Sequence, residues 1–282
     1  MSVLTVFSSS GDGWVRRATS DETFAINRAA SEGNLLDYTS TTTQAQITKS
    51  GTDNFDISRC FLPFDTSSLP DDATIDSATL SIYVTVKNDA DIVSLVLVQT
   101  TQASTSSLVL DDFDQCGTLN SPTEGAARIT VSGLTLNAYN DFTLNATGLT
   151  WISKTGFTKL GIRISRDGDN SEPTGVNNMV LSAFEETGTS QDPKLVINYT
   201  IATTTSTTTS TSTTSTSSST TKTDTTTTTS TTTTSSSTSS TSTSSTSSST
   251  SSTSSSTSST SSSTSSTSSS TTMPFSLAVD NV

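Results

Sequence analysis

The amino-acid sequence predicts an antiparallel β-sandwich that is followed by a Ser/Thr-rich stalk. Three observations lead to this prediction. Apolar and polar residues alternate with a period of two along several short segments of residues 1–202. Turn-forming clusters separate these segments, and no sustained helical stripe lies between them. Residues 203–272 are almost entirely serine and threonine, so the chain divides into one globular domain and one low-complexity segment.

The alternation is clearest in residues 80–86, 160–164 and 195–201, where every second side chain is Leu, Ile, Val or Tyr. This pattern is typical of a strand with one buried face. Further strands are predicted at 3–8, 58–64, 91–99, 127–136, 141–145 and 179–185, which gives nine or ten strands in all. We expect Leu62, Phe64, Leu80 and Ile82 to point into the core from neighbouring strands.

Three local features modify this pattern. Pro63 lies inside a predicted strand and lacks a backbone N–H, so we expect irregular pairing there. A helix of one to three turns is predicted within residues 145–154, with Leu149 and Ile152 facing the core. The long loop 101–125 carries Asp111, Asp112, Asp114 and Cys116, and it is the first candidate for a contact surface because long loops in compact domains are usually functional or mobile.

The C-terminal part of the chain has two expected roles. Residues 203–272 lack the apolar side chains needed to offset the entropy of ordering, so we expect an extended, O-glycosylated, mucin-like stalk. In residues 273–282, apolar side chains return at every second position. We predict that this segment docks as an added strand on another subunit through Phe275, Leu277 and Val279, the alternative being a frayed terminus.

Charge and cysteine content narrow the functional classes. The net charge is −13, and only Lys222, Asp224 and Asp280 lie beyond residue 202, so the globular part is acidic and unsuited to nucleic acid or anionic membranes. There is no apolar run long enough to span a membrane, and residues 1–13 do not have the pattern of a Sec signal peptide. Cys60 is in step with Leu62 and Phe64, so we expect a free buried thiol, with a disulfide to Cys116 as the alternative.

Several stretches carry a resemblance to a known family. They are Arg59-Cys60-Phe61-Leu62-Pro63-Phe64-Asp65, Ser67-Ser68-Leu69-Pro70, Ala73-Thr74-Ile75, Ser77-Ala78-Thr79-Leu80-Ser81-Ile82-Tyr83, Trp151, Gly161, Phe184-Glu185 and Pro193-Lys194-Leu195-Val196-Ile197-Asn198-Tyr199. Together they resemble the DNRLRE-type domain, which is related to disaggregatase-repeat and carbohydrate-binding jelly-roll modules. The resemblance covers roughly residues 10–200 and implies a jelly-roll sandwich of secreted, cell-wall or virion proteins without implying one ligand.

The opening of the chain extends this resemblance. Gly11-Asp12-Gly13-Trp14-Val15 is similar to members from tailed-phage and metagenomic viral genes. The chain departs from the family pattern in two places. Cys60 replaces a small residue, and Pro63 stands where an aromatic or basic side chain is usual, which puts the pairing of that strand in question.

The residue types present argue against catalysis. The chain has no histidine, which removes Ser-His-Asp and Cys-His constellations and imidazole zinc sites. No G-x-S-x-G elbow, phosphate loop or dinucleotide fingerprint occurs. A glycosidase using two carboxylates is the remaining enzymatic alternative. We therefore expect a protein that is not an enzyme.

Two groups of residues are candidates for binding. Trp14, Tyr139 and Trp151 are the expected aromatic platform for sugar rings, although large aromatic residues in a sandwich are more often part of the core. Asp167, Asp169, Asn170 and Glu172 gather oxygen ligands in one turn and form a candidate calcium site, the alternative being a solvated turn. Beside them, Arg163 and Arg166 are expected to form surface ion pairs.

The expected function is display, adhesion or assembly outside a cell or on a virion surface. In the first hypothesis the chain is a structural subunit of a fibre, filament or other appendage, and its partners are copies of itself or proteins of the appendage or virion base. In the second it is a module that binds a cell-surface glycan or receptor and uses the stalk for reach. A third hypothesis is an accessory domain of a polysaccharide-degrading system.

Overall fold

The computed structural model describes residues 1–202, so the predicted stalk 203–272 and the predicted docking residues Phe275, Leu277 and Val279 lie outside the described residues. The described residues form twelve strands: β1 Ser2–Phe7, β2 Gly13–Thr19, β3 Leu35–Asp37, β4 Thr42–Lys49, β5 Phe55–Asp65, β6 Ala73–Asp89, β7 Ser94–Gln99, β8 Ile129–Thr130, β9 Ala138–Thr143, β10 Phe157–Ile164, β11 Val176–Ser182 and β12 Lys194–Ile201. Helices are short: α1 Phe24–Arg28, α2 Ala146–Thr150, α3 Ser165–Gly168 and the 3-10 turns η1 Leu110–Gln115 and η2 Val131–Gly133.

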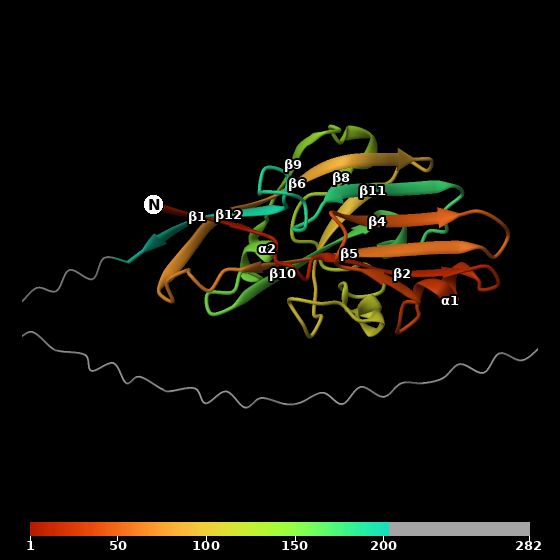
Figure 1. Cartoon of the computed structure of the whole chain (residues 1–282), viewed down its shortest axis with the longest axis horizontal. Helices are drawn as coiled ribbons and strands as arrows, with labels where there is room; N and C mark the ends of the chain where they lie inside the picture. Colours follow the sequence, from red (N-terminus) through yellow and green to blue (C-terminus); the bar gives the residue numbers. More distant parts are fainter. Residues whose placement is uncertain (203–282) are drawn as a thin grey trace, which may run out of the picture. The chain divides into compact units, whose positions relative to one another are not determined.

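The strands form an antiparallel sheet that curls around a core, as expected for a β-sandwich. The hydrogen-bonded order is β1-β12-β6-β11-β4-β5-β10-β7-β8, with β9 beside β6, β2 beside β5 and β3 beside β2. Each of the two longest strands pairs with one neighbour along its first half and with another along its second half. The first half of β6 pairs with β12 and its second half with β11; the first half of β5 pairs with β4 and its second half with β10. Figure 1 shows β11, β4, β5 and β2 running side by side. A bridge between Ser8 and Phe64 brings the end of β1 back to β5.

The core lies where the alternating pattern places it. Leu62, Phe64, Leu80 and Ile82 are fully buried, which confirms their predicted inward orientation. Burying a large apolar side chain contributes about 1.5–3 kcal/mol relative to leaving it exposed. Two expected strands differ from the prediction: residues 127–136 form only the short β8 and the turn η2, and β6 extends well beyond residues 80–86.

Pro63 disturbs the pairing of β5 on one side only. The ladder between β5 and β10 runs without a register shift, with Pro63 opposite Lys159, so the expected irregularity is absent there. On the other side the Pro63 carbonyl accepts a hydrogen bond from the Ser9 N–H at 2.9 Å, and the pairing is limited to the isolated bridge between Ser8 and Phe64. The side of the strand that lacks an N–H donor thus coincides with the weakly paired side.

Helix α2 and the two cysteines are both found within the described residues. Helix α2 lies within the predicted segment; its Leu149, and Ile152 just after its C-terminal end, pack against the core as expected. Cys60 and Cys116 are both buried and free, so the disulfide alternative is wrong. None of the helices within residues 1–202 combines the length and the apolar character needed to cross a membrane.

Candidate functional site

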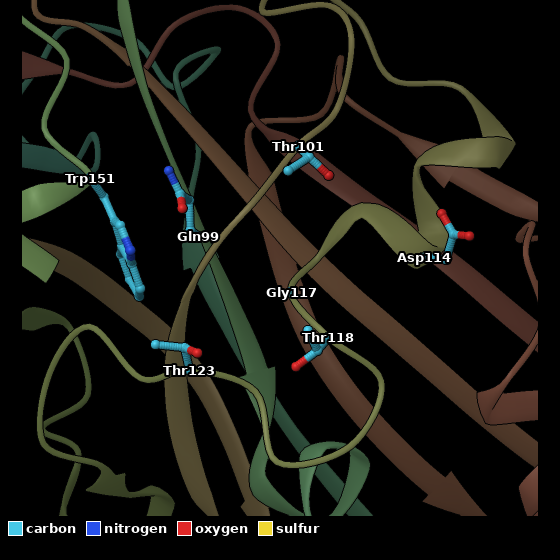
Figure 2. A pocket seen from close by; sticks show the side chains of 7 residues that line it. All are labelled: Gln99, Thr101, Asp114, Gly117, Thr118, Thr123 and Trp151. Atoms are coloured by element: carbon cyan, nitrogen blue, oxygen red, sulfur yellow. The ribbon is translucent and has the colours of Figure 1, made fainter. Parts of the chain in front are cut away.

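A pocket of about 430 Å³ opens beside the long loop that the sequence singled out. Its lining residues are Gln99, Thr101, Asp114, Gly117, Thr118, Thr123 and Trp151. Five of these seven belong to loop 101–125, while Gln99 ends β7 and Trp151 follows α2. Figure 2 shows Trp151 at one side of the pocket with Gln99 and Thr123 near it, and Asp114 at the opposite side.

The indole of Trp151 is positioned by close backbone packing at two glycines. Asn145 caps α2 by accepting a hydrogen bond from the Gly148 N–H, and its own N–H donates to the Gly125 carbonyl at 2.8 Å. A Cβ atom on Gly148 would lie 2.2 Å from the Gly125 carbonyl oxygen, and a Cβ on Gly125 would lie 2.1 Å from the Trp151 ring. Neither residue therefore tolerates a side chain without displacing Trp151 or α2.

The polar lining of the pocket is mostly uncharged. The amide of Gln99 and the hydroxyl of Thr123 make no side-chain hydrogen bond within the described part of the chain and are available to a ligand. Thr101 donates to the Gln115 side-chain oxygen at 2.5 Å, which orders the loop at the pocket rim. Asp114 is the one carboxylate among the lining residues. The site thus offers one aromatic ring with several neutral hydrogen-bonding groups around it.

A buried ionic network holds the loop in place. Asp167 accepts two hydrogen bonds from Arg59, both at 2.9 Å, and one from Arg163 at 2.7 Å. All three side chains are at most 2 % exposed. Burial by itself would raise the pKa of Asp167, but Arg163 and Arg59 outweigh it and hold that pKa well below its usual range. The carboxylate is therefore charged at neutral pH.

The arginines of this network also bind the loop backbone. Arg59 donates to the Phe113 carbonyl at 2.7 Å, and its guanidinium lies 4.1 Å from the centre of the Phe113 ring. Arg163 donates to the Thr118 carbonyl at 2.6 Å, and Arg28 contacts the carbonyl of Leu119 at 2.5 Å. Since Thr118 lines the pocket, the network fixes one wall of the candidate site. The expectation that Arg163 forms a surface ion pair is wrong, because loop 101–125 covers it.

The predicted calcium site does not form. Asp167 faces the buried arginines, Asp169 accepts two hydrogen bonds from Arg128, and Glu172 pairs with Lys49. Asn170 is in the left-handed conformation that ends the turn after α3, with a φ of 53°. Three carboxylates that each have their own cation do not leave oxygen atoms for a metal ion. The candidate set of Asp167, Asp169, Asn170 and Glu172 is therefore structural.

The three aromatic candidates do not form one platform. Trp14 is half-buried on β2, between β3 and β5, and does not line the pocket. The Tyr139 hydroxyl donates to the carbonyls of Ser190 and Asp192, its ring packs edge-on against Tyr83, and the Lys194 ammonium lies 4.0 Å from the ring centre. Tyr139 thus anchors the segment before β12. Of the three, Trp151 alone faces the pocket.

The sequence points to loop 101–125 and to Asp114 on it, but not to the other polar residues that line the pocket. Gln99, Thr101, Thr118 and Thr123 belong to residue types that are common throughout this chain, and nothing in their spacing distinguishes them. The length of the loop was the available signal.

Among known proteins, the chain has matches among solved structures. No family model and no curated protein matches the chain. Among solved structures, the chain is similar to a xylan-binding module, CBM15, with 12% sequence identity and a TM-score of 0.34 over 71% of this chain and 100% of that chain.

Proposed function

We propose that the domain formed by residues 1–202 is a non-catalytic carbohydrate-binding module whose ligand occupies the Trp151 pocket. The observation that carries this proposal is the combination of one aromatic ring with neutral hydrogen-bonding side chains in an open pocket. A pocket of about 430 Å³ is in the usual range, about 300–1,000 Å³, of small-molecule sites.

Sugar rings match such a lining chemically. A pyranose presents a face of C–H groups that packs on an aromatic ring, and hydroxyl groups around its edge that donate and accept hydrogen bonds. Trp151 supplies the ring, while Gln99 and Thr123 supply free donors and acceptors. The pocket lining holds one negative charge and no positive one, which disfavours phosphate ligands.

The same lining supports a binding role over hydrolysis. Glycoside hydrolysis ordinarily needs two carboxyl groups on opposite sides of the scissile bond, roughly 5–10 Å apart. Asp114 is the one carboxylate among the residues that line this pocket, and the chain has no histidine to act as a general base.

The wider setting remains a prediction from the sequence. Membership of the DNRLRE-type family, an O-glycosylated stalk, and a place on a virion surface or in an extracellular fibre or filament are proposals that accompany this one. A glycan-binding domain carried on a stalk is compatible with each of these settings, including adhesion to a host cell surface.

The proposal is tested with a glycan array and the full-length chain. We expect retention on one class of glycan and loss of that signal in Trp151→Ala and Gln99→Ala. Gln44→Ala is the matched control, because Gln44 is a half-buried glutamine on β4 that does not line the pocket. Thermal unfolding of each variant checks that the fold persists. Equal binding by wild type and both pocket variants would contradict the proposal.

A further inference from the structure

A second pocket, of about 280 Å³, borders the Trp151 pocket and has arginines in its lining. The two pockets share the lining residues Asp114, Gly117 and Thr118, and the second adds Arg28, Ala29 and Arg59. Figure 2 shows Asp114 and Thr118 on the side of the Trp151 pocket away from the indole, and the second pocket, here called the arginine pocket, adjoins that side. A ligand that packs on Trp151 and extends across this part of loop 101–125 therefore reaches the arginines.

Arg28 has two N–H donors without a partner. An arginine side chain carries five N–H donors. The Nε atom of Arg28 donates to the Asp167 carbonyl, and Nη2 donates to the Leu119 carbonyl at 2.5 Å and to the Asn120 side-chain oxygen at 2.7 Å. Nη1, which carries the other two donors, makes no hydrogen bond within residues 1–202. The side chain is only 3 % exposed, yet Nη1 is not among the enclosed atoms without a partner in this part of the chain, so it opens into the arginine pocket.

The buried network beside this pocket has an excess of positive charge. Asp167 is the single acidic side chain that pairs, within residues 1–202, with three guanidinium groups, those of Arg28, Arg59 and Arg163. Burial lowers the pKa of Arg28, and the two neighbouring guanidinium groups act in the same direction, against the Asp167 carboxylate. A second negative charge placed at Arg28 would therefore stabilise the network.

Asp114 does not supply this second charge. It is the one carboxylate that lines the arginine pocket, but it forms no salt bridge within the described part of the chain. Its Oδ1 atom instead accepts a hydrogen bond from the side-chain amide of Gln115. The unpartnered donors of Arg28 are thus available to a ligand.

We propose that the arginine pocket binds the carboxylate of a uronic acid residue, in an acidic glycan whose neighbouring ring packs on Trp151; this inference rests on the proposed function. A guanidinium group and a carboxylate match each other in charge and in planar geometry, and their hydrogen bonds are stronger than those between neutral groups. The net charge of −13 opposes an acidic ligand at long range, but this repulsion is screened beyond about 8 Å at physiological ionic strength. The local arginines therefore decide the preference.

The test measures binding of the full-length chain to galacturonate, glucuronate and mannuronate oligosaccharides, each beside its neutral, carboxyl-reduced counterpart. At least one acidic member should bind about 10-fold more tightly than its neutral counterpart, which is the order expected for one charge-assisted contact. Ala29→Asp adds a negative charge to the pocket lining without changing an arginine, so it should abolish this preference. The control Ala25→Asp adds the same charge at an exposed position of α1 outside both pockets and should keep it.

Two further variants separate this inference from the proposed function. Trp151→Ala should weaken binding of the acidic and neutral forms alike, whereas Asp114→Asn should raise the preference for the acidic form because it removes a like charge from the pocket. Equal binding of both forms by wild type would overturn the inference and leave glycan binding intact, while binding of neither form would refute both. A preference that survives Ala29→Asp would also overturn the inference. So would an Asp114→Asn variant that unfolds earlier without a stronger preference, because Asp114 would then be the partner of Arg28.

Discussion

Removing the Asp167 side chain is expected to destabilise the domain more than any surface change nearby. Asp167→Ala deletes three charge-assisted hydrogen bonds, at 2.9, 2.9 and 2.7 Å, and leaves Arg59 and Arg163 charged and buried. Removing one partner of a buried ion pair typically costs about 3–5 kcal/mol. For a domain of this size each kcal/mol lowers Tm by about 2–4 °C, so we expect a fall of about 6–20 °C.

The assay is urea unfolding followed by tryptophan fluorescence, with wild type and Asp169→Ala measured in parallel. Asp169 is two residues away and also binds an arginine, but it and Arg128 are 40 % and 33 % exposed. Exposed ion pairs contribute up to about 1 kcal/mol, so this control should change stability little. If Asp167→Ala and Asp169→Ala lower the free energy of unfolding equally, the network does not stabilise the fold in the way described.

Three further predictions follow from the same structure. Gly125→Ala should abolish glycan binding, because the added Cβ would lie 2.1 Å from the Trp151 ring. The control Gly156→Ala should bind normally on the same array, because its added Cβ would have its nearest neighbour at 3.9 Å. In the absence of divalent cations, the free energy of unfolding of wild type should fall between pH 4 and 7, by up to about 1.4 kcal/mol per pH unit relative to Asp12→Asn. The reason is that Asp12, whose pKa burial raises to about 7, stays protonated in the folded chain over this range but loses its proton in the unfolded one. Parallel pH profiles of the two proteins in urea titrations would contradict this. Burial raises the pKa of the Cys116 thiol to about 12 and raises that of Cys60 further. Neither thiol should therefore react with Ellman's reagent until urea unfolds the chain. Rapid labelling of the native protein would show that the thiols are accessible and would contradict this prediction.

The sequence identified those strands whose buried faces carry large apolar residues. The pattern does not predict strand β4, because its inward positions are Thr43, Ala45 and Ile47, two of which are small or polar. The pattern alternates, but its hydrophobic contrast is weak. Strand β2 is not predicted for a similar reason, since Val15 is its single large aliphatic residue. Both strands are held in the sheet by their hydrogen-bonded pairing with the central strand β5. A local sequence pattern does not reveal such long-range pairing.

The sequence was least informative about the second face of β10. Gly161 and Arg163 alternate with Leu160 and Ile162, which is typical of a strand with one exposed face. In the structure both faces are buried, because loop 101–125 covers the outer one: a Cβ on Gly161 would lie 2.8 Å from the Cys116 sulfur, and Arg163 is 0 % exposed. The identity of a residue on an alternating strand therefore does not decide its exposure when a long loop is available to cover it.

This covering loop links stability to the proposed binding function. Most of loop 101–125 lies outside the sheet, so its backbone carbonyls depend on partners other than neighbouring strands. Arg59 and Arg163 supply some of these partners at Phe113 and Thr118, and Asp167 keeps both arginines in place. The carboxylate that stabilises the domain thus also positions one wall of the Trp151 pocket. It follows that the domain can lose its ligand site through a change at Asp167, a residue that does not line the pocket.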